Sequence, residues 1–309
     1  LTATVGLYLM LATFATLILL VQHISTMLQA PNIAAAAGAE LLAVVRAANT
    51  ADATRDDDAT RETENRPDVQ DNPTYWAETE GYPVQVSNTG YIQFIDPEIL
   101  LTLAQDKDIV IHLLHKPGHF VGSGAVVALV WPPQRVDAHL DRLLRRAFQI
   151  GGGRTPTQDI EYAVNQLTEM AVRAMSPAIN DPFTAMTCLD HVELGLATFI
   201  QQGENSSHYF DQAGKLRLIL EPVTLAELLD AAVDMLRHAS CDNASVLLHM
   251  VKVLEALGRV TSAPAVRQAL LRHVTRIQAE SQVGALIEED RRTIHRKCQT
   301  VQATLEGAS

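Results

Sequence analysis

The chain has 309 residues, of which 47% are hydrophobic and 19% are charged, and its formal net charge is −12 at pH 7. This length exceeds the roughly 100 to 200 residues of one domain, so a membrane segment and two soluble units are expected. The acidic balance and the lack of a Lys/Arg stripe argue against nucleic acid as a partner. Cys188, Cys241 and Cys298 show no CxxC spacing, so no disulfide framework, zinc site or other cofactor is predicted.

The first 22 residues carry no charged side chain. An uncharged apolar run of this length predicts a helix that spans the lipid bilayer. A secretory signal peptide is the alternative, but it needs a basic segment ahead of a shorter apolar core. The chain opens inside the apolar run, which suggests that other spanning helices precede it. His23 stands where the helix leaves the lipid, as either an interfacial histidine or part of an ion pathway.

Four segments follow the spanning helix, and together they predict a mainly α membrane protein with a small β unit. Residues 23–50 read as a membrane-exit helix, which Pro31 interrupts. Residues 51–72 are acidic and without apolar periodicity, as expected of an exposed linker or loop. Short β-branched runs predict a β domain over 73–134, and the rest, 135–309, is expected to form an α-helical soluble domain.

Within the β domain, residues 116–130 resemble the hairpin of barrel-sandwich domains related to lipoyl carriers, where Pro-Gly turns the chain. The tip has no lysine for modification, so only the shape is inferred. His112 and His115 would point to opposite faces of a strand because their spacing is odd. These two and His119 are therefore expected to be packed or solvated rather than to bind a metal.

Apolar periodicity in the last domain predicts several helices. Their ranges are 137–150, 159–175, 182–202, 224–239, 244–257 and 264–304. In the last range, an apolar stripe that runs from Val266 through Leu270, Val274 and Ile277 to Val283 and Ile287 should pack against the other helices.

The densest polar cluster lies in two loops, 151–159 and 176–185, on either side of one predicted helix. The glycines at 151–153 could present N–H groups to an anion, but the GK[ST] ending of a phosphate-binding loop is missing. Asp181 and Pro182 fit a helix cap. A buried polar network that fixes the helix pair is favoured over a ligand site. The candidate residues are Arg154, Thr155, Gln158, Asp159, Arg173, Ser176, Asn180, Asp181, Thr184 and Asp190.

These loops, together with GYIQFID, KPGHFV and QHISTMLQ elsewhere, resemble the predicted bacterial membrane protein family named domain of unknown function 2254. The resemblance covers essentially the whole chain. It implies four spanning helices in the full protein, the last of which opens this chain, and it brings no established activity. Gln22 departs from the pattern, in which a second histidine more often stands beside His23.

The sequence is compatible with three functions. The first is an oligomeric channel or transport assembly in the bacterial inner membrane, with the soluble region as a gate or vestibule, expected in the cytoplasm. The second is an enzyme that uses Asp159, Asn180 and Asp181, and a pocket that holds all three would favour it. The third is a scaffold or sensor, in which the long last helix leaves an apolar strip free for a protein partner.

Overall fold

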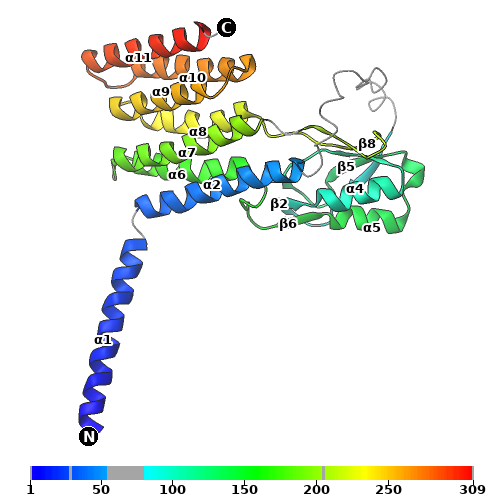
Figure 1. Ribbon diagram of the computed structural model, residues 1–309, viewed down its shortest axis with the longest axis horizontal. Coiled ribbons are helices and arrows are strands. Elements are labelled where there is room, and N and C mark those ends of the chain that lie inside the picture. The colour runs from blue at the N-terminus through cyan, green and yellow to red at the C-terminus, as the bar shows by residue number, and fades with distance from the viewer. Residues whose placement is uncertain (1, 28–29, 54–79, 204–205, 308–309) are drawn as a thin grey trace.

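The structure is a computed structural model that describes residues 2–27, 30–53, 80–203 and 206–307. Helix α1 (Thr2–Met27) extends away from the rest of the molecule (Figure 1). Among the described residues it is the one helix long and apolar enough to cross a membrane, with a mean hydropathy of 2.2 over Thr4–Val21 and no part of that window buried. The side chain of His23 lies outside what the structure describes.

The remaining helices outside the β unit form a bundle with a single apolar core (Figure 1). They are α2 (Ala30–Ala53), α6 (Ile160–Ala174), α7 (Pro182–Gln202), α8 (Leu225–Ala239), α9 (Ala244–Arg259), α10 (Pro264–Val283) and α11 (Glu288–Gly307). Asp159, Asp181, Thr224 and Asn243 accept backbone N–H bonds at the starts of α6 to α9, which explains where these helices begin.

Helix α2 belongs to this bundle although it precedes the β unit in the sequence. It packs against α6 and α7 through fully buried Leu41 and nearly buried Val45. The predicted membrane-exit helix, 23–50, is divided: its first residues belong to α1, and α2 begins at Ala30 with Pro31 in its first turn, where a missing N–H costs little. Residues 51–53 end α2, and the rest of the predicted linker, 54–72, lies outside the described residues.

The prediction of one long last helix over 264–304 is wrong. Two antiparallel helices, α10 and α11, meet at Gly284, where a Cβ atom would overlap the carbonyl of Cys241. Leu270, Val274 and Ile277 are fully buried, so α8 and α9 cover most of the predicted stripe. The stripe continues only as Val283 and Ile287, which are 85% and 65% exposed at the break.

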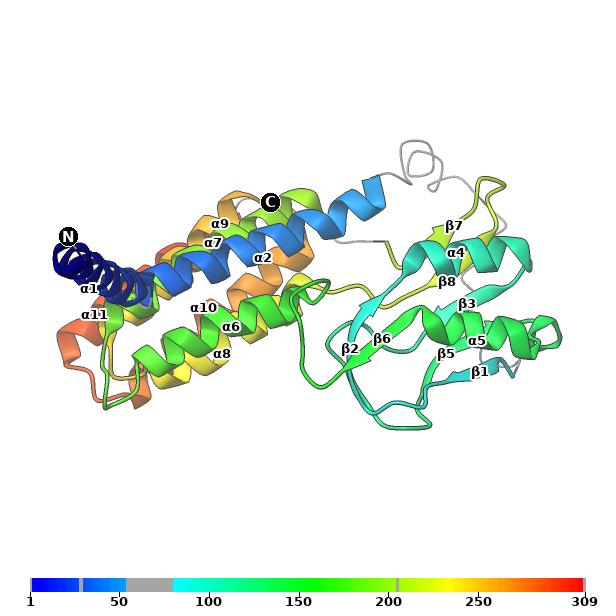
Figure 2. The same cartoon turned by 90° about the horizontal axis from the view of Figure 1, so that it is seen from below.

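The β unit has its own core, separate from that of the bundle. One sheet has the strand order β1 (Tyr82–Gln85), β5 (Val126–Trp131), β3 (Val110–Leu113), β8 (Leu216–Ile219), β7 (His208–Phe210). The other has the order β4 (Phe120–Val121), β2 (Gly90–Ile95), β6 (Phe148–Gly151). Helices α4 (Pro97–Asp106) and α5 (Ala138–Arg146) and the 3₁₀ turn η2 (Pro133–Arg135) complete the unit. Figure 2 shows the unit at one end of the bundle.

The limits of the β unit differ from the predicted 73–134. The predicted helix 137–150 stops at Arg146, because Phe148–Gly151 pairs with β2 as strand β6. Strands β7 and β8 lie between α7 and α8 in the sequence but extend the larger sheet beside β3. The barrel-sandwich hairpin over 116–130 is also wrong, since β4 pairs with β2 while β5 pairs with β1 and β3.

Candidate functional site

Three segments that are far apart in the sequence meet where the β unit touches the bundle. Strand β2 lies at the centre, and the loop from Lys116 to Phe120 bonds to it through the Gly118 N–H, which donates to the Ile92 carbonyl at 2.8 Å. The loop 151–159 bonds to it from the other side, since the Gln93 amide donates to the Gly153 carbonyl at 2.8 Å. Three of the segments that carried the family resemblance, GYIQFID, KPGHFV and the loop 151–159, therefore meet here.

Gln158 joins the two units most directly. Its side-chain amide donates to the Ile95 carbonyl at 3.0 Å and accepts the Ile95 N–H at 2.9 Å, as a neighbouring strand would. Thr155 adds a longer bond, from its hydroxyl to the Gln93 carbonyl at 3.4 Å. Because Gln158 directly precedes the N-cap of α6, these bonds fix the start of that helix against the edge of the sheet.

Arg154 and Asp159 form the ion pair at this junction. The Arg154 Nε and Nη2 atoms donate to the two carboxylate oxygens of Asp159 at 2.7 and 2.8 Å. These bonds raise the pKa of Arg154 against the opposing effect of burial. Asp159 also accepts the Tyr162 N–H and so caps α6, while the guanidinium lies 5.4 Å from the centre of the Tyr162 ring. One carboxylate thus holds both the loop and the helix.

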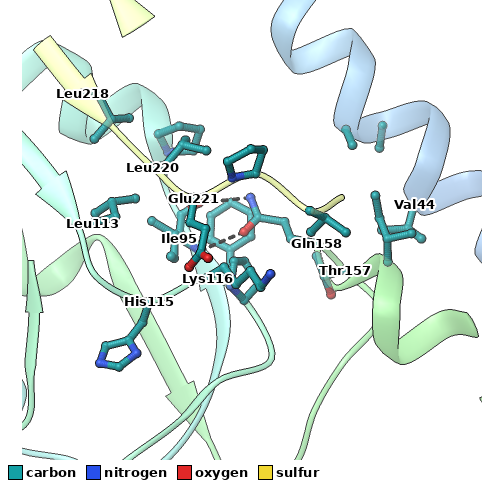
Figure 3. Close-up of a pocket in the computed structure, with 18 of the residues that line it drawn as sticks. Val44, Ile95, Leu113, His115, Lys116, Thr157, Gln158, Leu218, Leu220 and Glu221 are labelled. Carbon is teal, nitrogen blue, oxygen red and sulfur yellow. Dashed lines mark hydrogen bonds between the residues drawn. The ribbon is translucent and has the colours of Figure 1, made fainter. Parts of the chain in front are cut away.

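A cavity of about 310 Å³ lies beside this junction, between the bundle and the β unit (Figure 3). Its size is near the lower end of the range for small-molecule sites, roughly 300 to 1,000 Å³. The bundle contributes side chains of α2, α6 and α7, and the β unit contributes side chains of β2, β3, β7 and β8. Val44 of α2 lies on the opposite side of a mainly apolar interior from Leu113, Leu218 and Leu220 (Figure 3), and Ala48 of the same helix also lines the cavity.

Charged groups lie on one side of the cavity. The Lys116 ammonium donates to the Glu227 carboxylate in the first turn of α8 at 2.8 Å, and Lys116 is largely buried. Figure 3 shows the Glu221 carboxylate on the same side of the cavity as Lys116. The arrangement suits a mostly apolar small molecule with one polar group.

His115 lines this cavity, and His119 lies next to His115. Their Nδ1 atoms are 3.3 Å apart, so one ring must donate and the other accept. Burial, with help from Lys116 and His115, lowers the pKa of His119, so a neutral ring is favoured at pH 7. His115 lies beyond β3, so the predicted placement of His112 and His115 on opposite faces of one strand is wrong. Its ring instead meets that of His119 edge-on, with an interplanar angle of 77°.

The second predicted loop lies at the opposite end of α6 from Asp159. Helix α6 has 15 residues, so the two ends are about 22 Å apart. Asp181 bonds to the Thr184 hydroxyl and N–H at 2.6 and 3.1 Å, and these bonds lower its pKa. The single polar network predicted for both loops is therefore wrong, because it divides into two separate clusters. The pocket that would have joined Asp159 to Asn180 and Asp181 is not formed.

The other predicted site residues lie in a surface ion pair, in the turn after α6 or in a contact with α9. Arg173 pairs with Glu169 on the surface, and both side chains are well exposed. The Ser176 carbonyl accepts the N–H groups of Ile179 and Asn180 in the turn. Asp190 is not part of either cluster, and its Oδ1 atom lies 2.6 Å from Nε2 of His249 in α9.

Comparison with known proteins identifies the family of this chain. Residues 1–256 match the family described as "Predicted membrane protein", domain of unknown function 2254. The chain belongs to this family. It is similar to an uncharacterised protein of Mycobacterium bovis and to one of Mycobacterium tuberculosis, each 25% identical over 213 residues. That alignment covers 68% of this chain but only 41% of each relative. No solved structure matches the chain.

For this member of the family, one described cluster has the composition of a metal site. Asp230 and Asp234 of α8 and His273 of α10 have ligand atoms within 4.8 Å of one another. However, Arg276 donates to both carboxylates and Arg272 to one of them, at 2.9 to 3.3 Å. These arginines already balance the charge of the two aspartates, so the cluster is a salt-bridge network between two helices.

The cavity itself was not predicted. Its bundle wall comes from α2, which the sequence presents only as a membrane-exit helix, and its other walls come from β8 and the segment that leads to α8. Apolar residues such as Val44 and Leu220 carry no functional signal in a sequence. Among the lining residues, Gln158 belongs to the predicted polar cluster and Thr157 precedes it in the same loop.

Proposed function

We propose that this protein is part of an oligomeric channel or transport assembly, and that a small molecule in the junction cavity regulates it. The soluble region acts as the gate or vestibule of that assembly. The observation that carries the proposal is the double role of α2: it forms one wall of the cavity and it follows the candidate spanning helix α1 in the chain.

A cavity between two separately cored units is suited to control. A ligand shifts a conformational equilibrium only as far as it binds one state better than the other. Here the walls come from different cores, so a molecule that contacts Val44 on one side and Leu113 on the other binds best at one spacing of the two units. Occupancy would then bias the position of α2, and with it the segment that enters the membrane.

The charge of the chain supports cations as the transported species. A net charge of −12 raises the local concentration of cations at a vestibule. Several copies around one axis would supply the pathway, as is usual for symmetric membrane assemblies. The free thiols of Cys188, Cys241 and Cys298 suit a reducing compartment, which favours the bacterial inner membrane with the soluble region in the cytoplasm.

The test is ion flux from vesicles that contain the full-length protein. Potassium efflux is followed with an entrapped potassium-sensitive dye for the natural protein, Ala48→Phe and Ala43→Phe. Ala48 lines the cavity, so the larger ring fills it, whereas Ala43 is exposed elsewhere on the same helix. We expect a protein-dependent efflux that Ala48→Phe changes several-fold and Ala43→Phe leaves unchanged.

Two outcomes would contradict the proposal. Efflux no faster than from protein-free vesicles would remove the conduction function. If Ala48→Phe and Ala43→Phe change the efflux equally, filling the cavity has no specific effect and the cavity does not regulate conduction. Light scattering of the solubilised protein provides the accompanying measurement, with a mass of several chains expected.

A further inference from the structure

The loop between α6 and α7, residues 176–181, is held rigidly and yet presents apolar side chains to the outside. Asn180 has a positive φ of 46°, and the Asp181 N–H donates to the Ala174 carbonyl at 2.8 Å. Backbone N–H groups of the loop thus bond to carbonyls of the same turn and of the end of α6. Ile179 at the loop and Phe183 in the first turn of α7 are 60% and 77% exposed. An ordinary exposed loop has the reverse arrangement.

The register of α2 against α7 shows where this loop lies. Gly38 faces His191 so closely that a Cβ atom would come within 2.5 Å of the ring, and Leu41 lies against Gly195 in the same way. Further along, Val44 and Phe199 line the same cavity. The two helices therefore run parallel, and the same register continued backwards brings the start of α2 beside the first turn of α7. Figures 1 and 2 show both at the end of the bundle away from the β unit.

The start of α2 is tied closely to the spanning segment. The candidate span ends at Val21, and α1 continues to Met27, which adds about 9 Å of helix. Only three steps of chain separate Met27 from Ala30, and they reach at most about 10 Å. The start of α2, beside which the first turn of α7 lies, is therefore within about 20 Å of the hydrocarbon boundary.

We infer that the 176–183 segment is a membrane-surface contact, whose Ile179 and Phe183 side chains enter the boundary between headgroups and acyl chains. Its occupant is the lipid bilayer in which α1 is anchored. Exposed apolar side chains on a rigid support mark such surfaces, and they gain free energy in proportion to the apolar area removed from water. The contact would hold the membrane-proximal end of the bundle at a fixed height, while the cavity lies at its other end.

The test places a fluorescent reporter at this position in the full chain. Phe183→Trp is reconstituted in vesicles of phosphatidylethanolamine and phosphatidylglycerol, with and without brominated acyl chains, which quench tryptophan within the bilayer. The signal of the natural protein, which contains Trp76 and Trp131, is subtracted. Phe120→Trp is the matched control, because Phe120 is 60% exposed but belongs to the β unit at the other end of the bundle.

We expect brominated lipid to quench the added emission of Phe183→Trp at least twofold, and that of Phe120→Trp not at all. If aqueous acrylamide quenches the added emission of Phe183→Trp and brominated lipid does not, the loop lies in water and the inference is overturned. A blue-shifted signal that neither agent quenches would show that protein covers the loop, which also overturns it. The measurement requires no ion flux, so it stands or fails independently of the proposed gating.

Discussion

Arg154 and Asp159 are joined by two hydrogen bonds of 2.7 and 2.8 Å, and the side chain of Asp159 is only 3% exposed. The pair connects the glycine-rich loop to the first turn of α6, next to the turn that contains Gly118. Its position at the boundary of the two units makes it the best place to measure how strongly they are held together.

Asp159→Asn should lower the free energy of unfolding by about 2 kcal/mol, because it removes the paired carboxylate and leaves the guanidinium with only the Glu161 carboxylate, 3.6 Å away. The loss is smaller than the roughly 3 to 5 kcal/mol of a fully buried pair, since Arg154 is 23% exposed. Arg173→Gln, which breaks an exposed pair with Glu169, should cost less than about 1 kcal/mol. Thermal unfolding in detergent measures both, and equal losses would contradict a special role for Asp159.

Gly118→Ala should destabilise the protein by about 1 to 3 kcal/mol from backbone strain alone, because φ at this residue is +93°. A Cβ atom there would also overlap the Asp159 carboxylate. Gly122→Ala is the control, since nothing lies within 4 Å of a Cβ at that position. Its effect should stay within about 0.5 kcal/mol. A melting temperature of Gly118→Ala equal to that of Gly122→Ala would refute the close approach of the two loops.

Gln158→Met should loosen the β unit from the bundle, because both side-chain bonds to the Ile95 backbone are lost. Two such bonds contribute about 2 kcal/mol together. Limited proteolysis of the connections between the units should become several-fold faster. Gln149→Met, at an exposed position of β6, should cleave at the natural rate. An unchanged rate for Gln158→Met would mean that other contacts hold the units.

Stability should depend on pH through His273. This ring is fully buried, and burial lowers its pKa from 6.5 to about 4. Asp230 and Asp234 of α8 and Arg272 and Arg276 of its own helix surround it. Below pH 6.5 the His273 ring takes up a proton in the unfolded chain, whereas in the folded chain it stays neutral until the pH approaches 4. This group therefore leaves the free energy of unfolding unchanged above pH 6.5 and lowers it as the pH drops from 6.5 toward 4.

The pKa difference of about 2.5 corresponds to at most about 3 kcal/mol. The ring nitrogens lie 3.2 and 3.8 Å from oxygens of Asp230 and Asp234, but not in hydrogen-bond geometry among the described residues. Arg272 and Arg276 hold both carboxylates, so His273→Leu should fold and remove this component. The difference in unfolding free energy between the natural protein and His273→Leu, followed from pH 7 to pH 4, isolates the effect. A constant difference over that range would contradict a neutral buried ring.

Much of the fold follows from local patterns. The short β-branched runs of the predicted β domain contain strands that begin at Tyr82, Gly90, Val110 and Val126. The predicted starts of α6, α7, α8 and α9 are confirmed to within one residue, because N-cap residues act on the helix turn that follows them. Membership of the domain of unknown function 2254 family is likewise confirmed.

Long-range packing accounts for what the sequence did not predict. Phe148–Gly151 has the length of a helical turn but becomes β6 because β2 offers a pairing edge. The last predicted helix divides at Gly284, which has an extended backbone and lies so close to the α8–α9 turn that a side chain would not fit. The two polar loops looked like one cluster because only one helix separates them, yet that helix holds them about 22 Å apart.

An electron microscopy map of the intact full-length protein, purified in detergent from its native membrane, can show both the assembly and the occupancy of the cavity. We expect several copies around a common axis, and density for a small molecule between Val44 of α2 and Lys116 and Leu220 of the β unit. A single copy whose cavity is collapsed, with the walls of α2 and β8 in direct contact, would contradict the proposal.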